Sequence, residues 1–357
     1  MTSTLEPLSS SGPQAELSPE LAAFIAGLPK CELHVHLEGT LSPQLKLTLA
    51  QRNGISIAER SVAEVEATYR FDSLTSFLAV YYPAMRVLVT EEDFFDLAFA
   101  YLTKAASQGV RHAEMFFDPQ AHTGRGVPFD TVVRGYRRAI VTAQRELDIS
   151  GELILCFLRD LSAEFAMATL MESLPYKDWI IGVGLDSDER DNPPSKFAEV
   201  FARARAEGYL LTMHCDIDQQ DSIEHIRQVV EDIRVDRIDH GTNIVESQAL
   251  VDEVKRRGLG LTCCPVSNSF VTHDMKAAEI VALLRQNVRM TINSDDPAYF
   301  GGYMTENYAS LAAYAGLTAL EVLQLARNSF EAAWLAPRAL DRHLAELTAY
   351  AASHGVS

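Results

Sequence analysis

Residues 32–39 read ELHVHLEG, and the interpretation of the rest of the chain starts from this stretch. His34 and His36 lie two residues apart in an apolar run. Side chains alternate along an extended strand, so both imidazoles point to the same side. A strand that ends in this way presents two nitrogen ligands to one point, which suits a divalent metal such as zinc. Taken alone, the pair fits equally well with one packed and one solvated histidine, so further ligands have to come from elsewhere.

The composition is that of an acidic chain with ample material for a core. Its 357 residues are 47% hydrophobic, and the formal net charge is −18. This charge argues against nucleic acid or an anionic membrane surface as a partner, because both require a basic footprint. It favours a small neutral or weakly cationic substrate. The five cysteines, an odd number lying mostly in apolar runs, and the absence of a signal-peptide pattern predict a cytoplasmic protein with buried thiols.

Short apolar stretches alternate with helical patterns along the chain. Residues 1–17 are rich in Ser, Pro and Thr and are expected to form a flexible arm, followed by one domain at 18–357. The predicted strands are 31–36, 110–117, 152–158, 180–185, 209–214, 237–240, 259–264 and 290–293. Eight strand–helix units predict an α/β fold, a (β/α)8 TIM barrel, with extra helices after the first strand and at the C-terminus. The alternative is an open doubly wound sheet, but no Gly-x-Gly-x-x-Gly follows the first strand.

Metal-ligating residue types recur where these strands end, which is the end at which such barrels carry their active sites. His34 and His36 end the first strand, and His214 ends the fifth. Asp239-His240-Gly241 ends the sixth strand and Ser294-Asp295-Asp296-Pro297 the eighth. All of these side chains would face one mouth. The sequence therefore predicts a mononuclear metal site.

The expected ligands are His34, His36, His214 and one aspartate, with water completing the shell. Such a set leaves the open position that a catalytic metal needs, and the metal lowers the pKa of its bound water towards about 7. We expect one Zn²⁺ per chain, although Fe²⁺ or Mn²⁺ accept the same ligands. His240 need not be a ligand, since its position suits a residue that orients or stabilises the hydroxide.

The remaining histidines are given structural or surface positions. We expect His112 in a strand, His225 on a helix, His122 and His273 in loops near the mouth, and His343 and His354 solvated. Other zinc chemistries lack their motifs, because there is neither a His-Glu-x-x-His helix nor a Pro-Cys-x-x-Cys.

Together these residues resemble the metal-dependent adenosine deaminase family in order and approximate spacing over nearly the whole chain. The motifs are His34-Val35-His36, His214, Asp239-His240-Gly241, Cys264-Pro265-x-Ser267-Asn268 and Ser294-Asp295-Asp296-Pro297. Longer blocks at 116–120, 156–159, 182–187 and 291–302 are similar to its adenine deaminase branch.

The resemblance implies a (β/α)8 barrel in which His34, His36, His214 and Asp295 hold zinc. It also implies hydrolytic attack on the ring carbon that carries an amino group, with loss of ammonia. His240 would stabilise the hydroxide.

Substrate contacts are also implied by the resemblance. Asp296 would bond a ring nitrogen, N7 in a purine, and the loop around Ser187 would lie along the base. Glu38 occupies a position where nucleoside-specific members often carry a ribose contact. The chain gives no clear ribose pocket, so a free base is preferred.

One segment departs from the family pattern. The usual His-Ala-Gly-Glu is replaced at 214–220 by HCDIDQQ, so the glutamate position holds Ile217, which cannot transfer a proton. A positioned carboxylate contributes about 10²–10⁴-fold to such a step. Asp218, slightly preferred, could replace it, since the segment is about two residues longer than usual and would let this side chain reach inward. Asp216 could also do so, because it shares the face of His214 if the strand continues. Alternatively, both aspartates only cap the next helix.

The predicted activity is the hydrolytic deamination of adenine to hypoxanthine and ammonia. One alternative is the same chemistry on another amino-heterocycle, namely an N6-substituted adenine, another purine, a pterin or a pyrimidine. Another is a catalytically silent base or metal binder. The expected partners are a small heterocyclic base and, possible on the outer helices of a barrel, a second copy of the chain.

Overall fold

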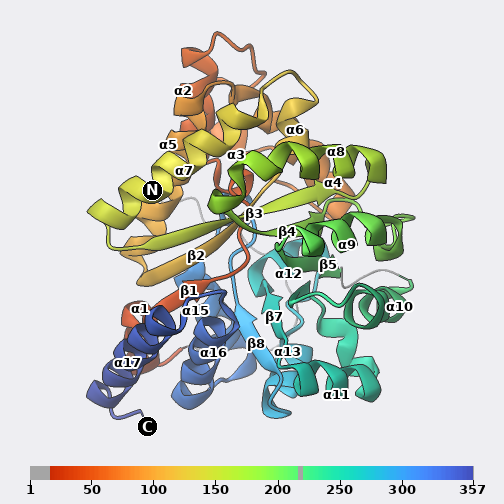
Figure 1. Cartoon of the computed structure of the whole chain (residues 1–357). Coiled ribbons are helices and arrows are strands. Elements are labelled where there is room, and N and C mark those ends of the chain that lie inside the picture. Colours follow the sequence, from red (N-terminus) through yellow and green to blue (C-terminus); the bar gives the residue numbers. More distant parts are fainter. Residues whose placement is uncertain (1–16, 216–219, 357) are drawn as a thin grey trace.

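The fold is an eight-stranded parallel barrel. The computed structural model describes residues 17–215 and 220–356, and within them the strands are hydrogen-bonded in sequence order from β1 to β8 (Figure 1). The strands are β1 (Lys30–Glu32), β2 (Val110–Phe117), β3 (Ser150–Leu158), β4 (Ile180–Asp186), β5 (Leu210–Cys215), β6 (Arg237–His240), β7 (Gly260–Cys263) and β8 (Arg289–Ile292). The predicted (β/α)8 architecture is confirmed. The expected arm at 1–17 lies outside the described residues except for Leu17.

The barrel closes through residues that lie just beyond β1 and β8. The Asp295 amide donates to the His34 carbonyl at 3.0 Å, and the His36 amide donates to the Asp295 carbonyl at 3.0 Å. An open doubly wound sheet has no such bond between its first and last strands. The first strand is shorter than predicted, because β1 ends at Glu32 and Val35 and His36 form only isolated bridges. Two of the candidate ligands therefore lie at the seam of the barrel.

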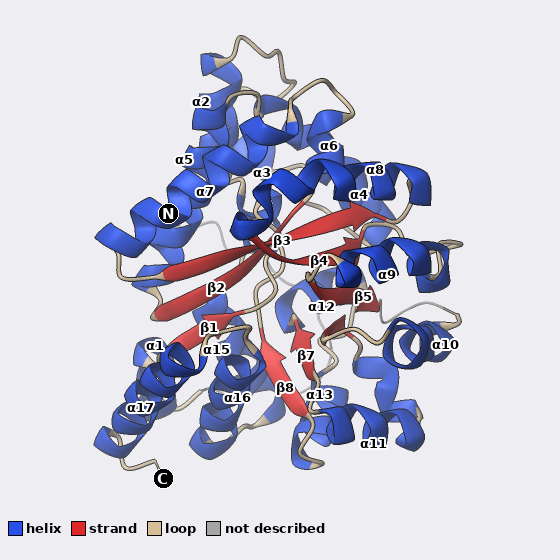
Figure 2. Cartoon of the chain, in the orientation of Figure 1, coloured by secondary structure: helices blue, strands red, loops and turns tan. Residues whose placement is uncertain are grey.

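Helices surround the strands (Figure 2). In chain order they are α1 (Pro19–Gly27), α2 (Pro43–Arg52), α3 (Val62–Glu66), α4 (Leu74–Ala84), α5 (Glu91–Ser107), α6 (Pro119–Thr123), α7 (Phe129–Glu146), α8 (Ala163–Ser173), α9 (Ala198–Ala206), α10 (Ser222–Arg227), α11 (Gln248–Arg257), α12 (Pro265–Val271), α13 (Ala277–Arg285), α14 (Pro297–Phe300), α15 (Met304–Ala315), α16 (Ala319–Ala332) and α17 (Pro337–Ser353). The extra helices expected after the first strand are α2 to α4. Those expected at the C-terminus are α15 to α17, and α17 packs against α1, where the Tyr350 hydroxyl donates to the Phe24 carbonyl at 2.9 Å.

The lower end of the barrel, opposite the strand ends that carry the histidines, is filled by side chains. Trp334, which follows α16, lies against Gly182 of β4, where a Cβ atom would come within 2.6 Å of the indole ring. The guanidinium of Arg237 lies 4.2 Å from the centroid of the same ring and forms an ion pair with Glu114. Both charged side chains are fully buried. We call these residues the floor of the barrel.

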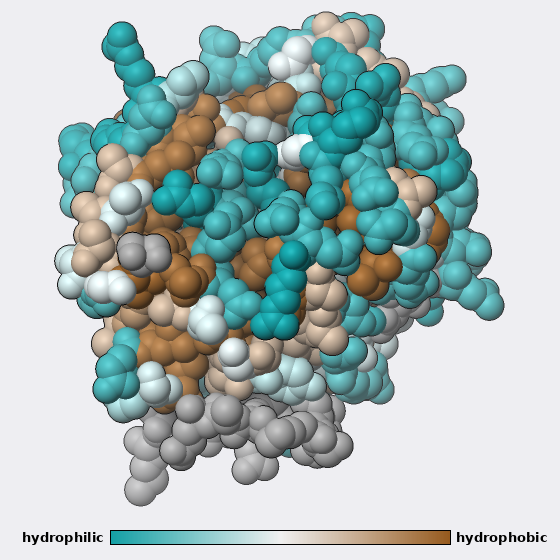
Figure 3. All heavy atoms as spheres, turned by 90° about the horizontal axis from the view of Figure 1, so that it is seen from below, coloured by the Kyte–Doolittle hydropathy of each residue, from teal (hydrophilic) through white to brown (hydrophobic). Residues whose placement is uncertain are grey.

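The prediction that the thiols are buried is confirmed. All five cysteines are described, buried and free of disulfides. In residues 17–215 and 220–356, none of the helices has the length and apolarity needed to cross a membrane. Seen from below, brown apolar patches lie between teal polar side chains (Figure 3). The homo-oligomer and the cytoplasmic location stay predictions.

Candidate active site

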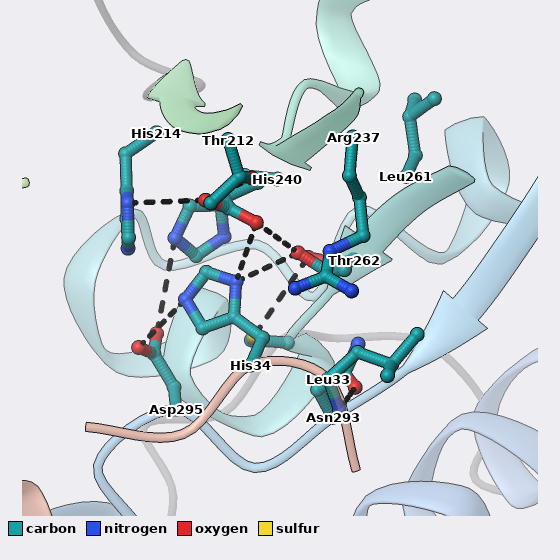
Figure 4. Close-up of polar contacts among 12 residues, drawn as sticks. Leu33, His34, Thr212, His214, Arg237, His240, Leu261, Thr262, Asn293 and Asp295 are labelled. Atoms are coloured by element: carbon teal, nitrogen blue, oxygen red, sulfur yellow. Dashed lines mark hydrogen bonds and ion pairs between the residues drawn. The ribbon is translucent and has the colours of Figure 1, made fainter. Parts of the chain in front are cut away.

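Five side chains from four strand ends meet at the mouth of the barrel. His34 and His36 come from the segment after β1, His214 lies near the end of β5, His240 ends β6, and Asp295 follows β8. His34 Nε2 lies 3.2 Å from Asp295 Oδ1, and His36 Nε2 lies 3.5 Å from the same oxygen. Figure 4 shows His34, His214 and His240 around one point opposite Asp295. The structure thus brings together all of the metal-site residues that the sequence singled out.

The arrangement of the ring nitrogens fits a bound cation. His36 Nε2 and His214 Nε2 lie 3.1 Å apart. The Nδ1 atom of His36 faces Asp186 Oδ2 at 3.4 Å, and that of His214 faces Asp239 Oδ2 at 3.6 Å. With protons on both Nδ1 atoms, facing the carboxyl groups, the two Nε2 atoms would present lone pairs to the same point, as ligands of a metal ion do.

Burial keeps the imidazoles in the form that binds metal. It lowers the pKa of His34 to about 3 and lowers the pKa values of His36 and His214 as well. Neutral imidazole is the ligand form. Burial alone would raise the pKa of Asp295, but His34 and His240 nearby hold it well below its usual range. One ligand atom from each of His34, His214, His240 and Asp295 lies within 4.8 Å of the others.

A carboxylate and two threonines support the ligand cluster from behind. The hydroxyls of Thr212 and Thr262 donate to Asp239 at 2.6 and 3.0 Å. Thr262 Oγ1 also lies 2.8 Å from His34 Nδ1 (Figure 4). Such contacts fix the tautomer and orientation of ligating histidines. Sequence reasoning placed Asp239 in a motif without a role and missed both threonines, whose only signal is a polar residue in an apolar strand.

The backbone is left-handed at three of the strand ends. The φ angles are 56° at His240, 63° at Asp295 and 72° at Ser187. This conformation is uncommon outside glycine, and its strain of order 1–3 kcal/mol is typical of functional sites. Gly39 is also required, since a Cβ there would lie 2.0 Å from Asp296 Oδ1.

A cleft of about 660 Å³, partly open to solvent, lies over this cluster. Its polar lining includes the predicted substrate-binding residues Asp296 and Ser187. It also includes Asp118, Asp186 and Glu189, which sequence reasoning missed. The apolar lining comes from Leu74, Phe77, Leu78, Tyr81, Tyr82, Val271 and Phe300. Most of these belong to α4, which lies far from the metal-site motifs in sequence.

Glu38 is not part of the cleft lining, and two histidines differ from the positions expected for them. Glu38 is fully buried away from the cleft lining, where it accepts hydrogen bonds from His122 Nε2 at 2.8 Å and the Tyr136 hydroxyl at 2.9 Å. The prediction of a loop for His122 is wrong, because the residue lies in α6. The prediction that His343 is solvated is wrong too, since it stacks on Phe330 and is 3% exposed.

The two candidate proton-transfer residues, Asp216 and Asp218, lie outside the described residues, as does Ile217. On one side of this segment, Arg159 Nη1 donates to the His214 carbonyl at 2.9 Å. On the other side, His225 of α10 lies 2.6 Å from Glu189 through its Nδ1 atom. The replacement of the family glutamate stays a prediction.

Comparison with known proteins places this geometry in a family. The model of the family described as "Adenosine deaminase" matches residues 29–349. The chain belongs to the adenosine deaminase family. A curated adenine deaminase of Zymomonas mobilis is 47% identical over 332 residues, covering 92% of this chain and 98% of the relative. An uncharacterised deaminase of Schizosaccharomyces pombe is 48% identical over 94% of this chain and 99% of its own length.

Two solved structures of the same fold support the assignment. An adenine deaminase from Arthrobacter aurescens superposes with a TM-score of 0.87 at 38% identity, covering 90% of this chain and 99% of its own. An amidohydrolase from Burkholderia ambifaria with bound Zn has a TM-score of 0.87 at 27% identity, covering 98% of each chain. As a member of this family, the chain is a metal-dependent amidohydrolase, and its His/Asp cluster fits that chemistry.

Proposed function

We propose that the chain is a zinc-dependent hydrolytic deaminase that converts adenine to hypoxanthine and ammonia. The observation that carries the proposal is the group of histidines and Asp295 at the base of a cleft lined by both carboxyl groups and apolar side chains. Relatives named adenine deaminase, at 47% identity over 92% of the chain, support the choice of substrate.

His34, His36, His214 and Asp295 would hold the metal, and three imidazoles with one carboxylate are a suitable set for zinc. The bound Zn in the Burkholderia ambifaria amidohydrolase supports this choice of metal. When bound, the ion supplies a Lewis acid and makes a water nucleophile available at neutral pH.

The protein's own side chains orient the reactants. His240 lines the cleft with its Nε2 atom 3.9 Å from Asp295 Oδ2, so it can orient the attacking water and hold its proton. Burial, with Asp295 nearby, raises the pKa of Asp296 well above its usual range. A protonated Asp296 can donate to an acceptor nitrogen of the ring, N7 in a purine. Ser187 lies along the same wall of the cleft.

Water attacks the carbon that carries the amino group, the carbon–nitrogen bond breaks, and ammonia leaves with the protons it gains. A carboxyl group has to move protons from the water to the ring and the leaving nitrogen, and Asp218 or Asp216 is proposed for this role. Tyr81, Tyr82 and Phe300 line the cleft, and a base bound against them would displace water and so strengthen the hydrogen bonds made to it.

The test is the turnover of adenine by protein loaded with zinc, followed as loss of adenine absorbance and release of ammonia. Turnover should stop on chelation and return with zinc. Asp218→Asn and Asp216→Asn are compared with Asp221→Asn, an exposed carboxylate just before α10, as a matched control. One of the first two should lower kcat by about 10²–10⁴-fold. If neither does, the role proposed for these aspartates is wrong.

A second candidate is favoured by the apolar part of the cleft. Leu74, Leu78 and Val271 line it and offer nothing that an unsubstituted adenine could hydrogen-bond. They provide apolar contact for an N6 substituent, so an N6-alkyl adenine would gain binding energy that adenine does not. Comparing kcat/KM for adenine and for a series of N6-alkyl adenines decides between the two substrates.

A further inference from the structure

Asp118 is a buried carboxyl group in the cleft wall that the proposed chemistry does not use. It follows β2 directly and precedes α6, it is 1% exposed, and it lines the cleft. Its Oδ1 atom receives no N–H or hydroxyl donor among the described residues, and its carboxyl group shares a hydrogen bond with the neighbouring carboxyl group of Asp186. Two carboxyl groups that share one proton still have acceptor oxygens without a donor, so such a pair in a cleft wall points to a ligand that donates an N–H.

The neighbouring Asp186 has a different task. Its Oδ2 atom lies 3.4 Å from His36 Nδ1, so Asp186 supports a metal-site histidine. One oxygen of Asp118, one oxygen of Asp186 and a ring nitrogen of His36 lie within 4.8 Å of one another. The other nitrogen of His36, Nε2, faces Asp295. The two carboxyl groups therefore lie on the side of the His36 ring away from the point of attack.

A purine base carries a matching donor. Its N9–H and the carbon that bears the amino group lie on opposite sides of the bond that fuses the two rings. In a nucleoside, N9 carries the sugar and has no hydrogen to donate. Resting on the proposed function, we propose that Asp118 Oδ1 accepts the N9–H of a free purine base and so selects bases over nucleosides. This oxygen can accept whether the carboxyl group is ionised or protonated.

The expected selectivity is large. A site built to bond a substrate N–H rejects an analogue without it by about 10⁴–10⁵-fold, because its buried polar group is left unpaired. The probe is 9-methyladenine, which has the reacting amino group but no N9–H. For the wild-type protein, kcat/KM should be at least about 10³-fold higher for adenine than for 9-methyladenine.

The experiment measures kcat/KM for both compounds with the wild-type protein, Asp118→Ala, Asp118→Asn and Asp160→Ala. Asp160→Ala is the matched control, because Asp160 is an exposed carboxylate two residues beyond β3, and its charge contributes to the raised pKa of Asp186. In Asp118→Ala the preference for adenine should fall at least tenfold, through slower use of adenine and unchanged or faster use of 9-methyladenine. Asp118→Asn should keep most of the preference for adenine, since the amide oxygen still accepts and the amide nitrogen can face Asp186. Asp160→Ala should match the wild type.

A preference that is unchanged in Asp118→Ala overturns the inference. So does equal use of the two compounds by the wild type, which is measured even if the alanine variant does not fold. Lack of any adenine turnover by the wild type would instead contradict the proposed function. Melting temperature and metal content are measured for each variant, so that a merely structural effect, which would slow both compounds alike, is recognised and also overturns the inference.

Discussion

The mouth and the floor of the barrel both bury charged groups, but they satisfy them differently. At the floor, Arg237 pairs with Glu114 and lies on the ring of Trp334. At the mouth, His36 Nε2 lies 3.1 Å from His214 Nε2, and the carboxyl group of Asp118 has only that of Asp186 as a hydrogen-bond partner among the described residues. At the floor the two opposite charges are paired within the fold, although Nε and Nη2 of Arg237 have no hydrogen-bond partner in the part of the chain that the structure describes. Buried charge is thus matched by an opposite charge at one end, whereas imidazoles and carboxyl groups surround a cleft at the other.

The largest effect is expected at the mouth, from Asp295→Ala. The change removes the carboxylate that faces His34 and His36. Metal content per chain should fall, and kcat should fall by at least about 10⁴-fold, because several kcal/mol of charge stabilisation depend on the metal. Metal analysis and the adenine assay measure both. Full metal content with normal turnover would remove Asp295 from the site.

The matching change at the floor is Glu114→Gln, which leaves Arg237 buried without its counterion. Breaking a buried pair in this way costs about 3–5 kcal/mol in the free energy of unfolding. Denaturant unfolding measures it, and kcat/KM of the folded variant should stay within about twofold of the wild type. If kcat/KM of the folded variant fell together with its stability, the floor would not have a purely structural role.

A pH effect on stability is expected from Lys30, also at the lower end. Its ammonium donates to the carbonyls of Leu28 and Gln108, and burial lowers its pKa to about 7. Between this value and the ordinary one near 10.5, the unfolded chain binds a proton that the native chain does not. Stability should therefore rise with pH across this window, by about 1.4 kcal/mol per unit where the difference is one full proton. Unfolding of the wild type and Lys30→Met at pH 8 and pH 10 isolates this contribution, and parallel curves would contradict it.

The smallest effect is expected behind the ligands, from Asp239→Asn. The carboxylate accepts from Thr212 and Thr262 and faces His214 Nδ1. Loss of such a contact typically costs 10–100-fold in metal affinity or activity. Asp236→Asn, three residues earlier and just before β6 begins, is the control and should change neither. Equal effects of the two substitutions would show that Asp239 has only a structural role.

The metal-site residues could be predicted because the apolar pattern marks where each strand ends, and the metal-ligating residues stand at those ends. His34, His214, His240 and Asp295 each come where an apolar strand ends, and parallel strands in a barrel deliver their ends to one mouth. The lowered pKa values of His34 and His214 could not be predicted, since they depend on burial by side chains from several strands.

The base-binding wall was harder to predict for a different reason. Asp118 before Pro119 has the sequence pattern of a helix cap, and nothing local shows that its carboxyl group faces a cleft. The aromatic residues of α4 that face it come from an insertion after the first strand, and their pairing with the mouth is purely tertiary. His343 was expected in solvent because it lies near the C-terminus, but it stacks on Phe330 and is buried.

The most direct test of the account is the turnover of adenine by the metal-loaded protein, before and after chelation. The account predicts that adenine absorbance is lost with one ammonia released per base, that chelation stops the reaction, and that zinc restores it. A metal-loaded, folded protein that deaminates neither adenine nor any N6-substituted adenine would contradict the claim that the mouth of the barrel is built around a metal and a free purine base.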